Sequence, residues 1–549
     1  MKCPICASDH IRPVEGAKRV FFRCAFCGFS WADPQSRPDE ETSRRRYRLH
    51  RNGEQNEGYT AFLSRVIDRA LAYAGKPMNA VDWGSGPNPL GAELLGRRGI
   101  ETLPWDPLFA HRQTPWKDAF DLVLCIETAE HFAEPRRDFR SIADCLKPGG
   151  WAFVHTHIAP QKDDDFLGWW YIQDITHLSF YSERSLRILS DIGSLAFIAL
   201  EENNLAVLRR PLPALIAGGI NLDIEGRPYR ELILRDSNPG KVCFSPGGCG
   251  RNIAENLSRL GLGTELISVV GDDVFGQGLK ESAQAAGIGI SGVAADKGKV
   301  TSTYLSLLDN YGDMTAAVSG MDIFDGFTPE HAEPAVDRAV TAAYSRCYGA
   351  NRDAPFSKLF VDGNLLPETS LYLQRRFPDL PCWLDPVSVT KTRRIAEYQQ
   401  GKLFSGLEGL KLNLLEIQAL LGDIGYDPHT PEYLEKLCRA IARELPGTVY
   451  VTLGSGGVLR VDRAGAVRFK GPAIEPRSTT GAGDAFLGAS LRRRILGTPE
   501  AAEDVIAGSA AAYLTLQSPQ AVSADLTAEV LESLILQWNQ QAQGRITIV

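Results

Sequence analysis

The sequence lacks any run of about 18 apolar residues, the length that a helix needs to cross a bilayer. Its first residues, Met1-Lys-Cys-Pro4, contain no apolar segment of the signal-peptide type. Internal repeats and low-complexity tracts are also missing. These absences argue against a secreted, membrane-bound or repeat protein. We therefore expect a cytoplasmic protein that has no membrane partner.

An excess of positive charge is missing too, because 59 Lys and Arg residues stand against 67 Asp and Glu residues, a net charge of −8. The overall field of such a chain does not recruit nucleic acid or an anionic membrane. A local basic run, Arg44-Arg45-Arg46 with Arg48 and Arg51, is either a nucleic-acid contact or a solvated face. At 549 residues, the chain is long enough for three or four domains.

Four of the eleven cysteines form two CxxC pairs, Cys3 with Cys6 and Cys24 with Cys27, seventeen residues apart. Cytosolic cysteines are mostly reduced thiols or metal ligands. This spacing is typical of a zinc ribbon, in which four thiolates close the coordination shell of a structural Zn²⁺. The alternative is four unrelated cysteines. We predict the ribbon over residues 1–33.

Residues 34–58 are polar and charged, and we interpret them as a linker before a helix that begins near Tyr59. Strands then alternate with helices. An apolar strand that contains Asp82 turns through Gly84-Ser-Gly86 into the next helix. This pattern is typical of the first βα turn of a doubly wound sheet, where nucleotide-like ligands bind.

Acidic residues end the next two strands of this pattern. Asp106 follows the second strand, about 20 residues after the glycines, where a carboxylate can accept hydrogen bonds from ribose hydroxyls. The third strand leads into Glu127 and then Glu130-His131, and the turn Leu146–Gly150 leads into the fourth.

This order of features resembles the class I S-adenosylmethionine-dependent methyltransferases, and the resemblance predicts a Rossmann-like domain over residues 59–210. Pro87-Asn-Pro89 stands where the family often has a further glycine. The alternative is a domain that binds the cofactor without turnover. The resemblance implies that S-adenosylmethionine is bound by Asp82, Gly84, Gly86, Asp106 and Glu127.

The segment Trp169-Trp170-Tyr171, followed by Asp174 and His177, resembles a loop of zinc-ribbon-bearing methyltransferases. Its aromatic rings could form the wall of a site for the methyl acceptor, and Asp174 or His177 could move a proton there. The alternative is a structural histidine on an aromatic core.

In the second half, Gly481-Ala482-Gly483 precedes Asp484 and an apolar run that predicts a helix. The helix N-terminus offers unpaired N–H groups to a phosphate or to a developing phosphoryl oxyanion. A carboxylate beside such an anion hole can take the proton of an attacking hydroxyl. The alternative is a glycine-rich turn capped by an aspartate.

Upstream, Asp223 follows a double glycine, and Gly247-Gly248 opens a helix with Asn252 on its first turn, where backbone and amide can reach sugar hydroxyls. Residues 302–308 alternate apolar and polar side chains before the turn 309–312. This pattern predicts a hairpin, which we place in a small sheet that acts as a lid.

From Lys358 onward, short apolar strands alternate with helices, which predicts a second doubly wound sheet. Asn413 and Glu416 are three residues apart on a predicted helix and could order Mg²⁺ near phosphates. The alternative is a surface Asn and Glu. Asn364 and Asp385 follow strands and are either base-reading residues or structural turn residues.

Together these features resemble the PfkB, or ribokinase-like, carbohydrate and nucleoside kinases over residues 212–540, which implies an α/β sandwich with a small β lid. The segments Asp236–Lys241, Gly250–Asn256, Thr301–Asn310 and Trp383–Ser388 resemble, within that family, the kinases that phosphorylate the 5′-hydroxyl of pseudouridine.

The resemblance implies that Asp484 is the catalytic base and that Gly481, Ala482 and Gly483 form the anion hole. The candidate substrate residues are Asp223, Gly247, Gly248, Asn252, Asn364 and Asp385. The candidate ATP and Mg²⁺ residues are Asn413, Glu416, Gly454, Gly456 and Thr480.

We therefore predict a bifunctional α/β enzyme that uses ATP, Mg²⁺, S-adenosylmethionine and a structural Zn²⁺, with a small-molecule nucleoside as its substrate. The resemblance also suggests a homodimer that pairs through the lid. The alternative is a kinase for another ribosyl nucleoside or sugar, whose N-terminal half is a non-catalytic module that binds S-adenosylmethionine or nucleic acid.

Overall fold

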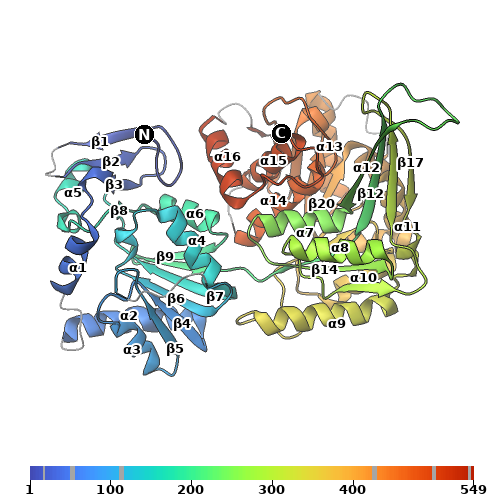
Figure 1. Ribbon diagram of the computed structural model, residues 1–549. Helices are drawn as coiled ribbons and strands as arrows, with labels where there is room; N and C mark the ends of the chain where they lie inside the picture. Colours follow the sequence, from blue (N-terminus) through green and yellow to red (C-terminus); the bar gives the residue numbers. More distant parts are fainter. Residues whose placement is uncertain are drawn as a thin grey trace. The chain divides into compact units, whose positions relative to one another are not determined.

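The computed structural model describes residues 1–15, 19–49, 56–109, 116–422, 430–497, 502–541 and 546–548. The chain forms two compact units (Figure 1). Unit 1 comprises Met1–Pro211 with Arg346–Ala350, and unit 2 comprises Leu212–Ser345 with Asn351–Val549. Among the described helices, none has the length and apolar character needed to span a membrane.

In chain order, the elements of unit 1 are β1 (Ile11–Val14), β2 (Phe21–Cys24), β3 (Ser30–Ala32), η1 (Pro34–Ser36), α1 (Glu40–Leu49), α2 (Glu57–Ala74), β4 (Asn79–Trp83), α3 (Leu90–Gly96), β5 (Glu101–Trp105), β6 (Phe120–Ile126), η2 (Ala129–His131), α4 (Pro135–Cys145), β7 (Leu146–His155), α5 (Asp163–Leu167), η3 (Trp170–Gln173), β8 (Ser179–Phe180), α6 (Glu183–Ile192), β9 (Ala196–Glu201) and β10 (Leu205–Arg209).

The larger sheet of unit 1 has the strand order β5-β4-β6-β7-β10-β9. Strands β5, β4, β6 and β7 are parallel, and β9 and β10 add an antiparallel edge. Helices α2 and α3 cover one face, and α4 and α6 lie on the other (Figure 1). Helix α2 buries Leu63, Val66, Ile67 and Ala70, a helical spacing that forms an apolar stripe. The structure thus confirms the predicted doubly wound sheet.

The smaller sheet of unit 1 has the order β1-β2-β3-β8, so its last strand comes from a segment far along the chain. Phe21, Phe166 and Phe180 pack edge to face beneath it, with ring centroids 5.4–5.6 Å apart. The N-terminal strands are therefore held to the rest of unit 1 by strand pairing and by an aromatic core.

Residues 34–58, which we expected to form a linker, contain α1 and the start of α2. Acidic residues in the first turn of α1 and arginines in its last turn favour this helix through its dipole. Within the predicted basic run, Arg44 pairs with Glu40 and Arg46 pairs with Asp174. Arg51 lies outside the described residues. Part of the run therefore makes contacts inside unit 1.

The elements of unit 2 are β11 (Ala214–Ala217), β12 (Asn221–Pro228), β13 (Gly240–Gly247), α7 (Cys249–Arg259), β14 (Thr264–Gly271), α8 (Val274–Ala285), β15 (Val293–Asp296), β16 (Thr303–Leu308), β17 (Met314–Gly320), η4 (Asp322–Gly326), α9 (Pro329–Arg346), β18 (Leu359–Asp362), α10 (Pro367–Arg376), β19 (Cys382–Asp385), α11 (Val389–Glu397), η5 (Tyr398–Phe404), β20 (Leu407–Asn413), α12 (Leu414–Leu421), α13 (Pro431–Glu444), β21 (Thr448–Thr452), η6 (Gly454–Gly456), β22 (Val458–Asp462), β23 (Gly465–Phe469), α14 (Ala482–Leu496), α15 (Glu503–Leu516), α16 (Ala528–Gln541) and β24 (Ile546–Ile548).

The main sheet of unit 2 has the order β15-β14-β11-β18-β19-β20-β21-β22-β23-β24, and it is parallel from β15 to β21. One apolar cluster packs α9 to α13 on one face, and a second packs α7, α8 and α14 to α16 on the other. A separate sheet, β13-β12-β16-β17, contains the predicted hairpin as β16 and β17. The predicted α/β sandwich with a small β sheet is confirmed.

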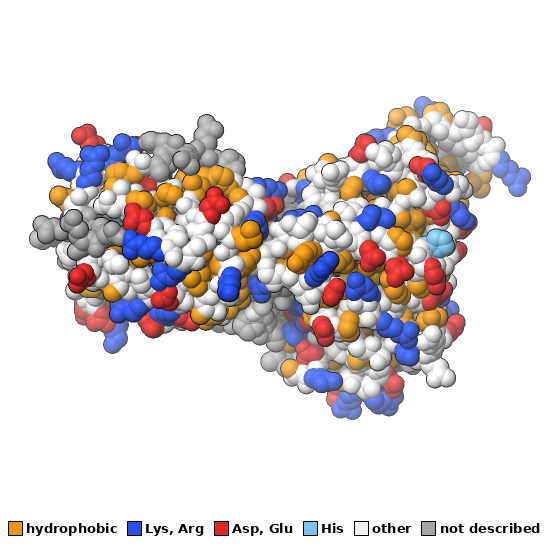
Figure 2. Space-filling view, turned by 90° about the horizontal axis from the view of Figure 1, so that it is seen from below, with side chains coloured by type: hydrophobic (Ala, Val, Ile, Leu, Met, Phe, Trp, Pro, Cys, Tyr) orange, Lys and Arg blue, Asp and Glu red, His pale blue; other side chains and the backbone are white. Residues whose placement is uncertain are grey.

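The strand register brings two predicted site residues, Asp385 and Asn413, to one edge of the main sheet. Asp362 is paired with Asp385 at the ends of β18 and β19, and Asn413 is paired with Thr452 at the ends of β20 and β21. Ligands of parallel α/β sheets bind at this carboxyl edge. On the face drawn in Figure 2, acidic and basic side chains are interspersed, in keeping with the small net charge.

Candidate active sites and metal centre

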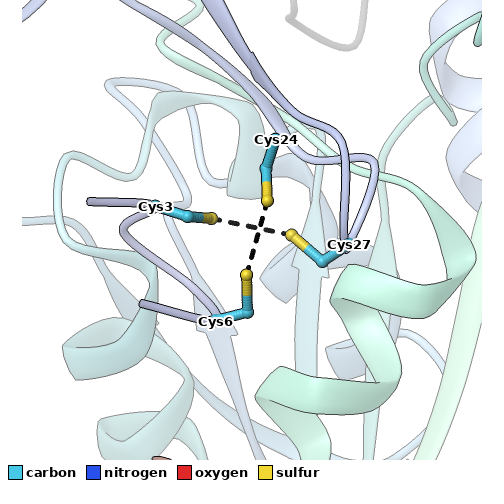
Figure 3. Close-up of side chains that lie close together, drawn as sticks. All are labelled: Cys3, Cys6, Cys24 and Cys27. Carbon is cyan, nitrogen blue, oxygen red and sulfur yellow. Dashed lines mark hydrogen bonds between the residues drawn. The ribbon is translucent and has the colours of Figure 1, made fainter. Parts of the chain in front are cut away.

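The four predicted zinc ligands point toward a common centre (Figure 3). The Sγ atoms of Cys3 and Cys27 are 3.6 Å apart, and those of Cys6 and Cys24 are 3.5 Å apart. All four side chains are buried free thiols. Zinc–sulfur bonds of about 2.3 Å in a tetrahedron separate sulfurs by roughly 3.8 Å, so a small expansion of this cluster accommodates the ion. The cluster fits a structural Zn²⁺ that four protein ligands enclose.

A cavity of about 830 Å³ opens in unit 1 at the carboxyl ends of β4, β5 and β6. Gly84, Gly86, Asp106 and Glu127 line it, as the sequence predicts. Asp82 is not among the lining residues. Its carboxylate accepts a hydrogen bond from the backbone of Ala92, and burial raises its pKa to about 7.

The glycine loop in this cavity depends on left-handed backbone and on close approach. Gly84 has φ +80°, and a Cβ there would lie 2.1 Å from Thr128. Gly86 has φ +63°, and its missing Cβ would point into open space. The N–H of Gly86 donates to Asp106, which also accepts from Leu108. These hydrogen bonds fix Asp106, at the end of β5, against the glycine loop. The glycine loop and the carboxylate together suit a nucleoside-like ligand.

The structure separates the two candidate acceptor-site residues. His177 lines the cavity, whereas Asp174 is not among the lining residues. The Asp174 carboxylate instead accepts from the backbone and hydroxyl of Thr176 and pairs with Arg46. His177 packs on Tyr171, with ring centroids 4.2 Å apart. His177 is thus packed on an aromatic ring and also faces the cavity. Asp174 instead stabilises the loop that contains it, through Thr176, and pairs with Arg46 of α1.

Some of the lining residues that carried no predicted role are ionisable: they include Tyr47, Glu130 and His131. Tyr47 lies on α1, in the segment that we expected to be a linker, and packs edge to face on His131. The Glu130-His131 pair was visible in the sequence, but its burial was not. Burial and the charge of Glu127 raise the pKa of Glu130 to about 7, while His131 and Tyr171 act in the opposite direction.

In unit 2, Asp484 lies on the first turn of α14, which Gly481 caps with φ +79°. A Cβ on Gly481 would lie 1.8 Å from the carbonyl oxygen of Ala521, and one on Gly483 would lie 2.9 Å from Lys411 Nζ. Gly481 therefore requires glycine, both for its left-handed backbone and for its close approach to a carbonyl, whereas a side chain at Gly483 would have to displace the end of the Lys411 side chain. The first turn offers its backbone N–H groups beside a carboxylate, as the sequence predicts.

Asp484 is partly exposed, so a substrate can reach it, and it accepts a hydrogen bond from Asn252 at 2.9 Å. Its protein surroundings raise its pKa to about 6 by desolvation, while Lys411 and Asn252 act to lower it. Lys411, which carried no predicted role, donates to Asp385 at 2.8 Å. Asp385 thus holds the lysine beside Asp484, and its predicted role in substrate binding stays a prediction.

Replacing Lys411 with methionine should shift the pH profile of any reaction in which Asp484 acts as the base. A base acts only when it is ionised, so kcat/KM should fall as the pH drops through about 6 in the wild type. Removing the ammonium group raises the pKa of Asp484, because the positive charge favours the carboxylate. The acidic limb should therefore move to higher pH.

The matched control for this pH profile is Lys358→Met, which removes another buried lysine that pairs with Glu408. Its acidic limb should stay in place. An unchanged limb in Lys411→Met would contradict the electrostatic role of Lys411.

The candidate substrate residues also meet at the carboxyl edge. A Cβ on Gly247 would lie 2.1 Å from Asp223, and one on Gly248 would lie 2.3 Å from the Gly219 carbonyl. Asp362, which was not predicted, accepts from the backbone N–H groups of Gly219 and Gly250 at 2.8 Å each. This buried carboxylate holds the two glycine segments together.

Asn364 lies beside the same segments. Its backbone N–H donates to Asp362 at 2.8 Å, and its side-chain oxygen accepts from Lys391. A Cβ on Gly219 would lie 2.6 Å from its amide nitrogen. Asn364 is therefore packed against the glycine that adjoins Gly248.

Asn413 and Glu416 form a reciprocal capping box at the start of α12, with hydrogen bonds of 2.9 and 2.7 Å. Glu416 is 1% exposed, so the alternative of a surface Asn and Glu is wrong. Gly454 and Gly456 form η6 directly after β21, the strand next to Asn413. Thr480 is exposed just before the cap of α14.

Comparison with known proteins finds a family model that matches each half of the chain. A family model for pfkB family carbohydrate kinases matches residues 216–528, and a methyltransferase domain model matches residues 54–191. The chain belongs to the pfkB family of carbohydrate kinases, and its N-terminal part carries a methyltransferase domain. It is an enzyme of the phosphotransferase class.

Two curated relatives of unit 2 are pseudouridine kinases. The one from Escherichia coli (strain K12) is 32% identical over 275 residues, which are 50% of this chain and 80% of the relative. The one from Arabidopsis thaliana is 29% identical over 185 residues, 33% of this chain and 44% of the relative. A solved carbohydrate kinase from Agrobacterium tumefaciens, 27% identical, covers 59% of this chain and 96% of its own, with a TM-score of 0.47.

Proposed function

We propose that unit 2 phosphorylates the 5′-hydroxyl of pseudouridine with ATP. The observation that carries the proposal is Asp484 on the first turn of α14, hydrogen-bonded to Asn252 beside the Lys411–Asp385 pair. Similarity to two pseudouridine kinases supports this particular nucleoside. The alternative substrate is another ribosyl nucleoside or a sugar.

In this reaction the Asp484 carboxylate takes the proton of the 5′-hydroxyl as the oxygen attacks the terminal phosphorus of ATP. The backbone N–H groups of Gly481 to Gly483 stabilise the charge that develops on the transferred group. Asp223, Gly248 and Asn252 would hold the ribose. Mg²⁺, which neutralises the phosphates when it is bound, would be ordered near Asn413 and Glu416.

A direct test is ADP release from Mg-ATP with pseudouridine, uridine, adenosine and ribose in parallel. The proposal expects the highest kcat/KM with pseudouridine. Activity confined to another of these substrates would support the alternative and would leave the role of Asp484 intact. Absence of activity with all four compounds would contradict the proposal that unit 2 phosphorylates a nucleoside or its ribose.

For unit 1 we propose binding of S-adenosylmethionine in the 830 Å³ cavity, at Gly84, Gly86, Asp106 and Glu127, with methyl transfer to an acceptor near His177. The open space at Gly86 and the adjoining Asp106 carboxylate support this placement. The alternative is a module that binds the cofactor without turnover.

Asp106→Asn should weaken binding of S-adenosylmethionine about 10- to 100-fold, because hydrogen bonds to a charged acceptor contribute roughly 1.5–3 kcal/mol. Calorimetric titration of the purified protein measures this change. Asp68→Asn, at an exposed ion pair with Arg98, should bind as the wild type does. Equal affinities of wild type and Asp106→Asn would refute the placement.

We also infer that two copies of the chain pair through the small β sheet of unit 2. Large apolar side chains on this sheet are exposed to solvent, which is unusual for a protein surface left uncovered. They are Val242, Phe244, Leu305, Met314 and Val318.

A further inference from the structure

A cluster of Glu130, His131 and His177 lies on the wall of the unit 1 cavity, and a ligand atom from each lies within 4.8 Å of the others. Two imidazoles and one carboxylate form a donor set that binds first-row divalent metals and leaves coordination positions open. The zinc ribbon uses none of these residues.

Glu130 is 0% exposed, and neither of its carboxylate oxygens makes a hydrogen bond of ordinary length and angle among the described residues, although the nearby Tyr171 hydroxyl acts as a donor that lowers its pKa. A buried carboxylate that is so poorly hydrogen-bonded is costly unless a positive charge compensates for it. The negative charge of Glu127 also repels the ionised Glu130 carboxylate. The surroundings of Glu130 therefore favour a bound cation.

Both histidines are oriented as metal ligands usually are. The Nδ1–H of His131 donates to the carbonyl of Thr176 at 2.9 Å, and the Nδ1–H of His177 donates to the carbonyl of Tyr171 at 2.8 Å. A carbonyl oxygen can only accept, so these bonds fix the tautomer that carries its lone pair on Nε2. Metal-bound histidines are held by this kind of outer hydrogen bond.

We propose that Glu130, His131 and His177 bind a first-row divalent transition metal on the wall of the methyl-transfer cavity. The cation faces the cavity that Gly86 and Asp106 also line, so its open positions are available to an oxygen of the acceptor.

The binding of an acceptor oxygen to this cation rests on the proposed methyltransferase function. A metal-bound hydroxyl is acidified and gives its proton to water. The oxygen then forms a bond to the methyl carbon while the carbon–sulfur bond of the sulfonium breaks, and the electron pair stays on sulfur. The site thus selects acceptors that present a hydroxyl.

The test is a titration of the zinc-loaded, nucleotide-free full chain with Mn²⁺, in which electron paramagnetic resonance detects the free ion. Mn²⁺ suits carboxylate ligands and does not compete well for the thiolates of the ribbon. We expect one strongly bound Mn²⁺ per chain in the wild type. Glu130→Gln and His177→Ala should each weaken it at least about tenfold.

Two controls separate this site from others. His10→Ala, at an exposed histidine of the ribbon, should bind Mn²⁺ as the wild type does. Asp484→Asn should also retain binding, which distinguishes the site from the Cys249, Asp385 and Asp484 cluster of unit 2. Binding of S-adenosylmethionine by Glu130→Gln, measured separately, shows whether unit 1 is folded.

If Glu130→Gln does not fold, His177→Ala and His131→Gln provide the same comparison. The proposal is overturned if the wild type takes up no Mn²⁺, or if folded variants of the three ligands bind it as tightly as the wild type. Neither result depends on methyl transfer, so the metal site and the methyltransferase function can fail separately.

Discussion

Asp484→Asn is expected to lower kcat of the kinase reaction by about 10²- to 10⁴-fold, the usual contribution of a general base. The amide keeps the shape of the side chain and an oxygen that can accept from Asn252, but it cannot take the proton of the attacking hydroxyl. ATP affinity should change by only a few-fold, because the backbone N–H groups of α14 stay in place. ADP release and ATP titration measure the two quantities.

The matched control is Asp379→Asn, at an exposed aspartate in the turn before β19, which should retain the wild-type kcat. Substantial turnover in Asp484→Asn would exclude Asp484 as the base. A loss of ATP binding that parallels the loss of kcat would instead indicate that the variant disturbs the helix N-terminus.

Cys24→Ser, or removal of zinc by a chelator, is expected to unfold the ribbon. Metal binding contributes about 10–16 kcal/mol to small zinc domains at neutral pH, more than most domains have in total stability. The ribbon is also bound to the rest of unit 1. Arg23 donates to the carbonyls of Pro160 and Gln161, Arg136 donates to the carbonyl of Ile5, and the hydroxyl of Ser182 donates to the carbonyl of Cys27.

Strand β3 of the ribbon pairs with β8, which begins two residues after His177. Unfolding of the ribbon should therefore disturb the cavity at His177 and weaken binding of S-adenosylmethionine. Kinase activity should remain, since unit 2 has its own cores. Cys243→Ser, a half-buried cysteine outside the cluster, is the control. A Cys24→Ser protein with an unchanged melting profile and full cofactor binding would contradict a structural zinc.

Local patterns predicted the features that depend on neighbouring residues. The glycines before Asp484, the two CxxC pairs and the β16–β17 hairpin follow from turn chemistry and periodicity, and the structure shows each arrangement. The family resemblances added the Rossmann-like domain and the α/β sandwich with a small β sheet, which the structure also shows. The roles assigned to site residues stay proposals.

Pairings between distant residues could not be read from the sequence. Asp385 looked like a base-reading or turn residue, but Lys411 binds it across neighbouring strands. Asn413 and Glu416 suggested one face of a helix, whereas Asn413 caps that helix. Helix α1 was missed because it buries no residue, so its sequence lacks an apolar stripe.

The most direct test of the central claim is the ratio of kcat/KM for pseudouridine to that for uridine, with the phosphorylated position identified by ³¹P nuclear magnetic resonance. The two nucleosides share the ribose and differ in the bond to the base. A kinase that reads the C-nucleoside should give a ratio well above one and a 5′-phosphate product. A ratio near or below one, or a phosphate elsewhere on the ribose, would contradict the proposed function.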